Sequence, residues 1–512
     1  MKILSVDQLY EADKISIEKQ GIDSTKLMER AATQVFEWMH RRLQGTAVPI
    51  HIFCGIGDNG GDGLVVGRLL IEQGYHVIVY VVNCSEKRSK DFLINYDRIK
   101  NVTKEWPTLI KSEDDFPEIK REDIIVDAIF GIGLNRAPGG WVKKLIQYLN
   151  ASKAFKLAID IPSGLFANEP LGDKEAVLKA NFTLTFQTPK LSFFLPETSP
   201  FFSDFDVLDI GLDKEFIHSS KSLAQVIQKL EAQEFYIPRK KFGHKGTYGH
   251  GLIVAGSYGK IGAAVLSTLA TLRIGSGLVT AFIPKCGYQV MQTTAPEAMV
   301  ITDSCDDFLS KISIDFAPSA IGVGMGIGKN KATREALSHL FQSNTCPFVI
   351  DADALNLISD DKELMKVIPK NSILTPHPGE LKRLIGKWKD DYDKLEKTKR
   401  FSKKHEVVVV IKGANTITVY GDELFINSTG NPGMGTAGSG DVLSGVITGL
   451  LCQGYDHLLA SVFGVYLHGA AGDMASHQLG YEAVIASDII KNLGNAYLDL
   501  LNQEKLSEKN QQ

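Results

Sequence analysis

The residues best suited to chemistry lie in one glycine-rich stretch, Gly430 to Gly445, whose only charged member is Asp441. An apolar run with helical spacing follows it (Val446, Ile447, Leu450 and Leu451), so the stretch is predicted to lead into a helix N-terminus. Glycines let backbone N–H groups approach an anion, and a helix N-terminus adds unpaired donors and a positive dipole end. The stretch therefore predicts a phosphate-binding loop.

Asp441 has two interpretations within this loop. A carboxylate beside a bound phosphate is repelled by it unless it has its own task, such as taking a proton from a substrate hydroxyl. The alternative is that Asp441 only caps the helix. The Gly-x-Gly-Asp context favours the base.

The segment Thr436 to Asp441 resembles the anion hole and catalytic base of the ribokinase-like superfamily, and Gly430 to Met434 is closer still to the nicotinamide-nucleotide hydrate dehydratases. The resemblance covers about residues 235–500 and implies a three-layer αβα domain with Asp441 as base. It implies that hydrated nicotinamide nucleotide contacts Ala263, Gly324, His377 and Asp441. It also implies an ADP-binding set: Lys412, Gly413, Ala414, Asn415, Thr416, Asn431, Pro432, Gly433, Met434, Gly435, Thr436, Ala437, Gly438, Ser439 and Gly440.

The elements expected to position these residues are strands of a mostly parallel sheet, because each candidate loop follows an apolar run. Strands are predicted at 252–255, 278–283 and 407–411, and further strands end before Gly324, Asp351 and Thr375. Asp351 and Asp353 either position Mg²⁺ through water or cap a helix. The dehydratase resemblance implies Mg²⁺ in this half.

In the first half, a predicted strand at 50–54 runs into a Gly-rich loop at 55–63, followed by a helix at 64–73. Gly55, Gly57 and Gly60 match the G-x-G-x-x-G of a dinucleotide-binding turn. However, the next predicted strand, 76–82, ends at Asn83 rather than at an acid that would hold a ribose hydroxyl. The loop also carries two acids, Asp58 and Asp62, which suit a cation with phosphate nearby.

Two more predicted strands, 123–129 and 156–161, end in polar loops that should converge with the first. Together the three loops resemble the nicotinamide-nucleotide hydrate epimerase domain, over about residues 1–215, and imply a Rossmann-like three-layer fold. The resemblance implies one K⁺ held by Asn59, Asp127 and Ser163, oxygen donors that suit a hard cation. The substrate set implied is Asp58, Asn59, Gly60, Gly61, Asp62, Gly131, Ile132, Gly133, Leu134, Asn135, Arg136, Ala137 and Asp160.

Three residues of this half have further interpretations. Asp160 is also predicted to be catalytic. Asp58 departs from the family, which more often has Asn there. Lys190 either meets a substrate phosphate or is a solvated surface lysine.

Bulk properties point to small-molecule chemistry. The 512 residues suffice for two domains, here placed at 1–215 and 235–500, with a charged helical connector at about 213–233 and a disordered tail at 501–512. The net charge of -4 gives no basic excess for nucleic acid or an anionic membrane. Six scattered cysteines, no leader and no membrane-length apolar run predict a reducing cytoplasm.

The resulting hypothesis is a bifunctional repair enzyme, an isomerase joined to a lyase. The first domain epimerises the R and S forms of hydrated NADH and NADPH; the second dehydrates the S form at the expense of ADP. The residues do not decide ADP against ATP, or NADH against NADPH. A homo-oligomer is expected. The alternatives are a vitamin-type kinase with an appended Rossmann domain, and a first half that is only a binding scaffold.

Overall fold

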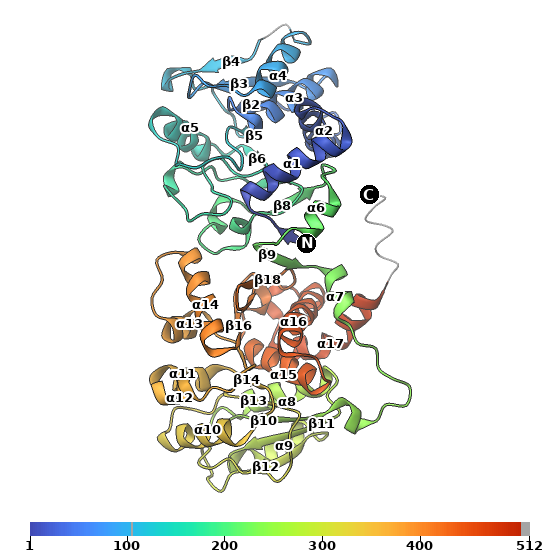
Figure 1. The fold of residues 1–512 in the computed structure, drawn as a ribbon, viewed down its shortest axis with the longest axis vertical. Coiled ribbons are helices and arrows are strands. Elements are labelled where there is room, and N and C mark those ends of the chain that lie inside the picture. The colour runs from blue at the N-terminus through green and yellow to red at the C-terminus, as the bar shows by residue number, and fades with distance from the viewer. Residues whose placement is uncertain (104–105, 503–512) are drawn as a thin grey trace. The chain divides into compact units, whose positions relative to one another are not determined.

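The computed structural model describes residues 1–103 and 106–502, and the predicted disordered tail lies, from 503 onward, outside the described residues. The chain divides into two compact units, coloured from blue to green and from green to red in Figure 1. The N-terminal unit comprises Lys2–Ala224 with Asp390–Tyr392. The C-terminal unit comprises Met1, Gln225–Lys389 and Asp393–Gln512.

The N-terminal unit is built on a seven-stranded parallel sheet in the order β4-β3-β2-β5-β6-β7-β8. From β2 the chain adds β3 and β4 on one side, and then crosses to add β5 on the other side of β2. Ligands of such parallel sheets bind at this switch point, beyond the carboxyl ends of β2 and β5. The strands are β2 (Ile50–Cys54), β3 (Val77–Val82), β4 (Thr108–Ile110), β5 (Ile124–Ala128), β6 (Phe155–Ile159), β7 (Phe182–Phe186) and β8 (Phe205–Leu208), after a short β1 (Lys2–Ile3). The helices are α1 (Val6–Gln20), α2 (Ser24–Leu43), α3 (Asp58–Glu72), α4 (Lys90–Lys100), α5 (Gly140–Ala151) and α6 (Lys214–Ser219), with single turns η1 (Glu113–Asp115), η2 (Lys174–Ala176), η3 (Leu191–Phe194) and η4 (Ser199–Phe201).

Both faces of this sheet are covered, which is why its strands are almost wholly apolar. Successive side chains of a strand point to opposite faces. In β2, Ile52 and Cys54 join the core under α2, α3 and α4, whereas Phe53 joins the core under α5. The unit is therefore a three-layer αβα sandwich, as predicted.

The C-terminal unit contains a larger sheet in the order β9-β18-β17-β16-β15-β14-β13-β10-β11-β12. Strands from β12 to β16 are parallel, and β17 and β18 add an antiparallel meander to β16. The strands are β9 (Ala224–Ile227), β10 (His250–Val254), β11 (Leu278–Ile283), β12 (Met299–Thr302), β13 (Ala320–Val323), β14 (Phe348–Ile350), β15 (Ile373–Leu374), β16 (Val408–Ile411), β17 (Ile417–Tyr420) and β18 (Glu423–Asn427). The switch point lies between β10 and β13.

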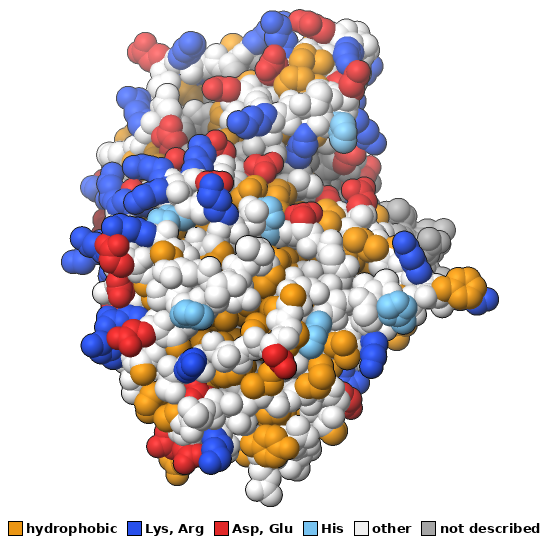
Figure 2. Space-filling view, turned by 60° about the horizontal axis from the view of Figure 1, so that its bottom comes forward, with side chains coloured by type: hydrophobic (Ala, Val, Ile, Leu, Met, Phe, Trp, Pro, Cys, Tyr) orange, Lys and Arg blue, Asp and Glu red, His pale blue; other side chains and the backbone are white. Residues whose placement is uncertain are grey.

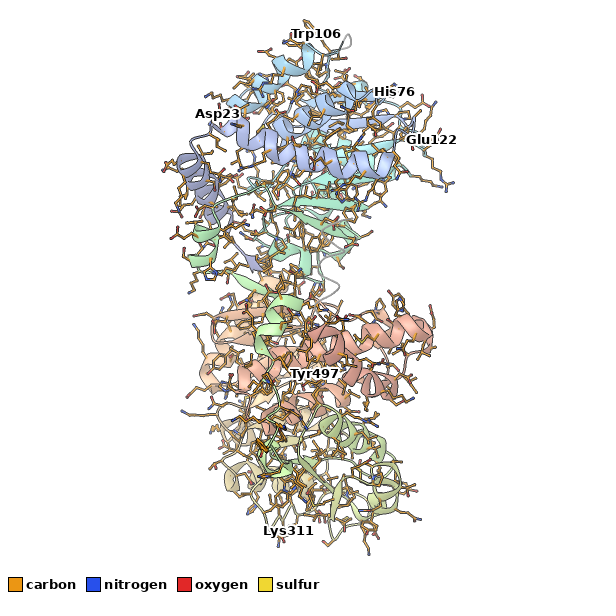
Figure 3. The ribbon with its side chains drawn as sticks, turned by 90° about the vertical axis from the view of Figure 1, so that its right-hand side faces the viewer. Asp23, His76, Trp106, Glu122, Lys311 and Tyr497 are labelled. Atoms are coloured by element: carbon orange, nitrogen blue, oxygen red, sulfur yellow. The ribbon has the colours of Figure 1, made fainter. Side chains whose placement is uncertain are left out.

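Helices cover this sheet on both faces (Figure 1). One face packs against α8, α15, α16 and α17, and Tyr497 of α17 meets Tyr236 and Phe463 with ring centroids 6.0 and 6.1 Å apart (Figure 3). The other face is covered by α10 and its neighbours, where Phe341 meets Phe348. The helices are α7 (Lys229–Phe235), α8 (Ile261–Arg273), α9 (Tyr288–Thr294), α10 (Lys331–Ser343), α11 (Ala352–Asp360), α12 (Lys362–Lys366), α13 (Pro378–Ile385), α14 (Asp391–His405), α15 (Ser439–Cys452), α16 (His457–Leu479) and α17 (Ala486–Leu501), with turns η5 (Lys245–Tyr248), η6 (Lys285–Gly287), η7 (Pro432–Met434) and η8 (Tyr481–Ala483).

Three local predictions differ from the structure. The Gly-rich segment after β2 is not a loop up to residue 63, because α3 already begins at Asp58. The predicted connector contains strand β9, which pairs with β18 and was missed because it is short. Helix α16, within the described residues, has the length and hydropathy of a membrane span, although none was expected; 72% of its apolar window is buried, as in a core helix.

The surface agrees with the small net charge. On the face shown in Figure 2, Lys and Arg side chains lie among acidic and apolar ones.

Candidate active sites

The N-terminal unit has a cavity of about 920 Å³ at the carboxyl ends of its central strands. Most of the predicted substrate residues line it: Asp58, Asn59, Asp62, Gly131, Ile132, Gly133, Leu134, Asn135, Arg136, Ala137 and Asp160. Gly60 and Gly61 do not line it but lie beneath it in α3. A Cβ on Gly60 would stand 1.9 Å from the carbonyl oxygen of Gly55, so glycine is required for α3 to start this close to β2.

Asp160 follows β6 in a left-handed conformation (φ 65°), which is rare for a residue other than glycine and is found at functional sites. The carboxylate is held from several sides. Its Oδ2 accepts from the N–H of Ile132 at 3.3 Å, and its Oδ1 accepts from Thr185 and from the N–H of Phe186, both at 3.4 Å. Its Oδ1 also pairs with Lys190 at 2.9 Å. The strained backbone thus aims a fixed carboxylate into the cavity.

Lys190 is 1% exposed, so its interpretation as a solvated surface lysine was wrong. Besides Asp160, its ammonium group donates to the carbonyls of Phe186 and Thr188, both at 3.1 Å. An ammonium group has three N–H donors, and these three partners use them all. Lys190 therefore neutralises and orients Asp160 and has no donor left for a phosphate.

The predicted K⁺ ligands lie next to the cavity. Ser163 donates to Asp127 twice, from its hydroxyl at 2.6 Å and from its backbone N–H at 2.8 Å, and its Oγ also contacts the carbonyl of Phe130 at 3.4 Å. Asn59 packs against Gly131, and its buried amide nitrogen has no partner among the described residues. Burial raises the pKa of Asp127 to about 6, while the hydrogen bonds from Ser163 and from the N–H of Ile129 lower it. The carboxylate, hydroxyl and carbonyl oxygens gathered here are ligand types that a hard cation prefers, whereas the unpartnered nitrogen of Asn59 is a hydrogen-bond donor and would not itself bind the ion.

Two cavity residues, Tyr10 and Asp13, were missed by sequence reasoning. They lie on α1, a helix to which no functional residue was assigned from the sequence. The available signal was Asp13 itself, an acid directly after the buried Ala12.

In the C-terminal unit, Asp441 is the third residue of α15. The N-cap is Gly438, in a left-handed conformation (φ 87°), and no described side chain caps the helix. The interpretation of Asp441 as the N-cap was therefore wrong. Burial, first, and the neighbouring Asp351 raise the pKa of Asp441 to about 6, and Lys412 opposes the shift. No described residue hydrogen-bonds to its carboxylate, which leaves it free for a substrate proton.

Asp351 organises the charges around Asp441. It is fully buried, and its Oδ1 accepts from Lys412 and from the N–H of Ala352, both at 2.7 Å, while its Oδ2 accepts from Ser444 at 2.7 Å. It is the N-cap of α11, as one interpretation had it. Glu380, another missed residue, is buried 4.0 Å from Lys412.

Asp353 lies on the exposed side of this cluster. Its Oδ2 accepts from the N–H of Gly328 at 2.9 Å and pairs with Lys260 at 3.3 Å. Its other carboxylate oxygen accepts no hydrogen bond from the described residues. Asp353 is therefore better able than Asp351 to bind the water shell of a metal ion.

Two of the predicted substrate contacts, Ala263 and Gly324, lie near Asp441 or its neighbour Asp351. Ser267 of α8 donates to the carbonyls of both Ala263 and Asp441, at 2.9 and 3.0 Å. Gly324 has φ 122°, and a Cβ there would lie 2.0 Å from the carbonyl oxygen of Asp351. His377 is the N-cap of α13, with its side chain 53% exposed.

The two predicted nucleotide segments also converge. A Cβ on Gly440 would lie 3.3 Å from the Lys412 ammonium, so the glycine loop and the lysine face one another. The preceding loop is held by Asp473 of α16, a residue not predicted: it accepts from the amide of Asn431 at 2.8 Å and from the N–H of Gly430 at 2.9 Å. The backbone donors of this loop are thereby fixed in place.

Comparisons with known proteins match both units. The family described as YjeF-related protein N-terminus matches residues 24–192, and the family described as NAD(P)H-hydrate dehydratase matches residues 251–495. The chain is 34% identical to a Moorella thermoacetica protein, over 96% of this chain and 95% of that one, and 31% identical to one from Escherichia coli, over 95% and 92%. Both are described as bifunctional NAD(P)H-hydrate repair enzymes. A Bacillus subtilis ADP/ATP-dependent NAD(P)H-hydrate dehydratase, solved with ATP and Mg²⁺, is 27% identical over 54% of this chain and 99% of that one, with a TM-score of 0.49.

Proposed function

Because the chain belongs to the family of bifunctional NAD(P)H-hydrate repair enzymes, we propose a division of labour between its two units. The N-terminal cavity interconverts the R and S forms of hydrated NADH and NADPH. The C-terminal cluster around Asp441 then dehydrates the S form at the expense of ADP. One observation carries the proposal: a partly buried carboxylate, with no hydrogen-bond partner in the part of the chain that the structure describes, stands in the first turn of a helix that begins in a glycine loop.

The chemistry of the second step explains this arrangement. Hydroxide is a poor leaving group, whereas phosphate is a good one. Asp441 takes the proton of the ring hydroxyl, whose oxygen then attacks the terminal phosphoryl group of the nucleotide. Loss of phosphate from this carbon and of a proton from the neighbouring ring carbon restores the ring double bond. Lys412 and the N–H groups from Gly438 to Gly440 face the transferring phosphoryl group and stabilise its charge.

Two cations are part of the proposal. Mg²⁺ would neutralise the nucleotide phosphates, held through water by Asp353. K⁺ would lie among Asn59, Asp127 and Ser163, where it supplies positive charge beside the substrate phosphates. The oxygens of Asp127, Ser163 and Phe130, which lie within hydrogen-bond distance of one another, support the second site.

The rival functions account for less of the molecule. A vitamin-type kinase would explain Asp441 but not the first cavity. A non-catalytic scaffold would not explain why Asp160 has a strained backbone and is paired with the buried Lys190.

We also propose a homo-oligomer in the cytoplasm. Six cysteines, all free, support a reducing compartment. Exposed apolar side chains at the end of α16 and along the following segment support association: Leu479, Tyr481, Ile485 and Leu498. Sedimentation at several protein concentrations tests the oligomer.

The test of the function uses each purified epimer of hydrated NADH with ADP or ATP. The near-ultraviolet absorbance of intact NADH should return with the S form directly and with the R form after epimerisation. No recovery from the S form with either nucleotide would refute the proposal.

A further inference from the structure

The geometry of the N-terminal cavity points to Asp13 of α1 as the proton-transfer residue of epimerisation. We propose that its carboxyl protonates the departing ring hydroxyl and takes the proton back when water returns on the opposite ring face. This inference rests on the proposed function of the N-terminal unit. It assigns the proton transfer to a helix outside all three predicted loops.

Five carboxyl groups line the cavity. Asp91 is occupied by a hydrogen bond from the Thr25 hydroxyl, and the surroundings of the other four separate them. Asp160 has both oxygens engaged by donors and a buried lysine, so it is placed as an acceptor rather than as a proton donor. Asp58 is exposed to water. Burial and neighbouring carboxylates raise the pKa of Asp62 well above its ordinary value, so it keeps its proton.

Asp13 differs from these three. It lines the cavity, is half-buried, and accepts no hydrogen bond from the described residues. Burial, first, and then Asp160 and Asp58 raise its pKa to about 7, whereas Lys190 lowers it. A group that is half protonated near neutral pH is the most effective acid and base there.

Tyr10 closes the cavity next to Asp13. A Cβ on Gly133 would lie 2.5 Å from the hydroxyl oxygen of Tyr10, so α1 lies against the predicted substrate loop. Burial and the nearby Asp58, Asp160 and Asp13 raise the pKa of Tyr10, which therefore stays a neutral donor. The other ionisable groups lining the cavity are Cys84, Lys87, Asp91 and Arg136.

The reaction balances without any added reagent. Water adds across an enamine so that the hydroxyl stands on the carbon bonded to nitrogen. Asp13 donates its proton to this hydroxyl, the carbon–oxygen bond breaks with its electron pair leaving on water, and the nitrogen lone pair forms a C=N⁺ bond. Water then attacks the other face, the C=N⁺ electrons return to nitrogen, and the excess proton returns to Asp13. Asp160 lies in the same cavity, but its charge is paired with Lys190, so the proton transfer does not rely on it.

The test is Asp13→Asn in the full chain, assayed for conversion of one purified epimer into the other. We expect epimerisation to fall by about a hundred- to ten-thousand-fold, mainly in kcat, while dehydration of the S form and the melting temperature stay unchanged. Asp7→Asn, on the exposed side of the first turn of the same helix, is the matched control and should epimerise normally.

A pH profile gives a second measurement that does not depend on the folding of a variant. Because the carboxyl must be protonated for the first step, the unmodified enzyme should lose epimerisation as pH rises through about 7. Near-normal epimerisation by Asp13→Asn, or a rate flat in pH between 6 and 8 (roughly one unit either side of that pKa), would overturn the assignment of Asp13. Absence of epimerisation from the unmodified enzyme would instead refute the function proposed for the unit.

Discussion

The two units each place a lysine–aspartate pair beyond the carboxyl ends of a parallel sheet, but the pairs are built differently. Lys190 and Asp160 are 2% and 8% exposed at the side chain, and the lysine has no donor left. Lys412 is 21% exposed, and its only close acceptor among the described residues is the buried Asp351. Lys190 holds Asp160 in place, whereas Lys412 keeps N–H donors available for an anionic ligand. The same two residue types are thus a fixed support in one site and a ligand-binding group in the other.

The largest expected effect is on Asp441. Asp441→Asn keeps the size of the side chain but removes the proton acceptor, so dehydration should fall by about a hundred- to ten-thousand-fold. Epimerisation and ADP binding should persist, as measured by epimer conversion and calorimetry. Dehydration at close to the normal rate would show that Asp441 is not the base.

The two lysines should respond oppositely to the same substitution. Lys190→Met leaves Asp160 buried without its counter-ion and should destabilise the N-terminal unit by about 3–5 kcal/mol, measured by chemical denaturation. Lys412→Met should chiefly weaken ADP binding, measured by calorimetry, with little loss of epimerisation. If Lys190→Met left stability unchanged but weakened substrate binding, Lys190 would be a ligand-binding residue after all.

Asp127 tests the separation of the sites. Asp127→Ala removes the carboxylate from the proposed K⁺ site, so epimerisation should lose its dependence on K⁺ and fall by roughly tenfold or more. Dehydration of the S form should be unaffected. Replacing K⁺ by Li⁺ in assays of the unmodified enzyme is the matched control, and an equal loss of both activities would contradict separate sites.

The smallest expected effect is on the pH dependence of the two activities, which should have opposite signs. Asp441 acts deprotonated, and its pKa is raised to about 6. Dehydration should therefore fall as pH drops through 6, whereas epimerisation, which needs a protonated acid, should fall as pH rises through about 7. Parallel profiles would show that one of the two assignments is wrong.

The α/β class, most strands and the loops that carry the chemistry could be predicted from the sequence. Strand 50–54, the position of Asp160 at a strand end and that of Asp441 at a helix N-terminus follow from local patterns, because apolar runs, glycine turns and strand-end acids are read within a few residues. The segment 58–63 was placed in a loop because glycines usually break helices. Only the close approach of α3 to Gly55 explains why these glycines form the start of a helix.

Which of these groups face one another could not be predicted and is seen only in the folded chain. Tyr10 and Asp13 line the first cavity from a helix about 45 positions before Asp58. Lys190 pairs with Asp160, which precedes it by 30 positions. Asp351 and Glu380 meet Lys412 across strands that are distant in sequence. Burial and electrostatic coupling depend on these through-space distances, so residue type and spacing along the chain cannot reveal which carboxyl group holds a proton.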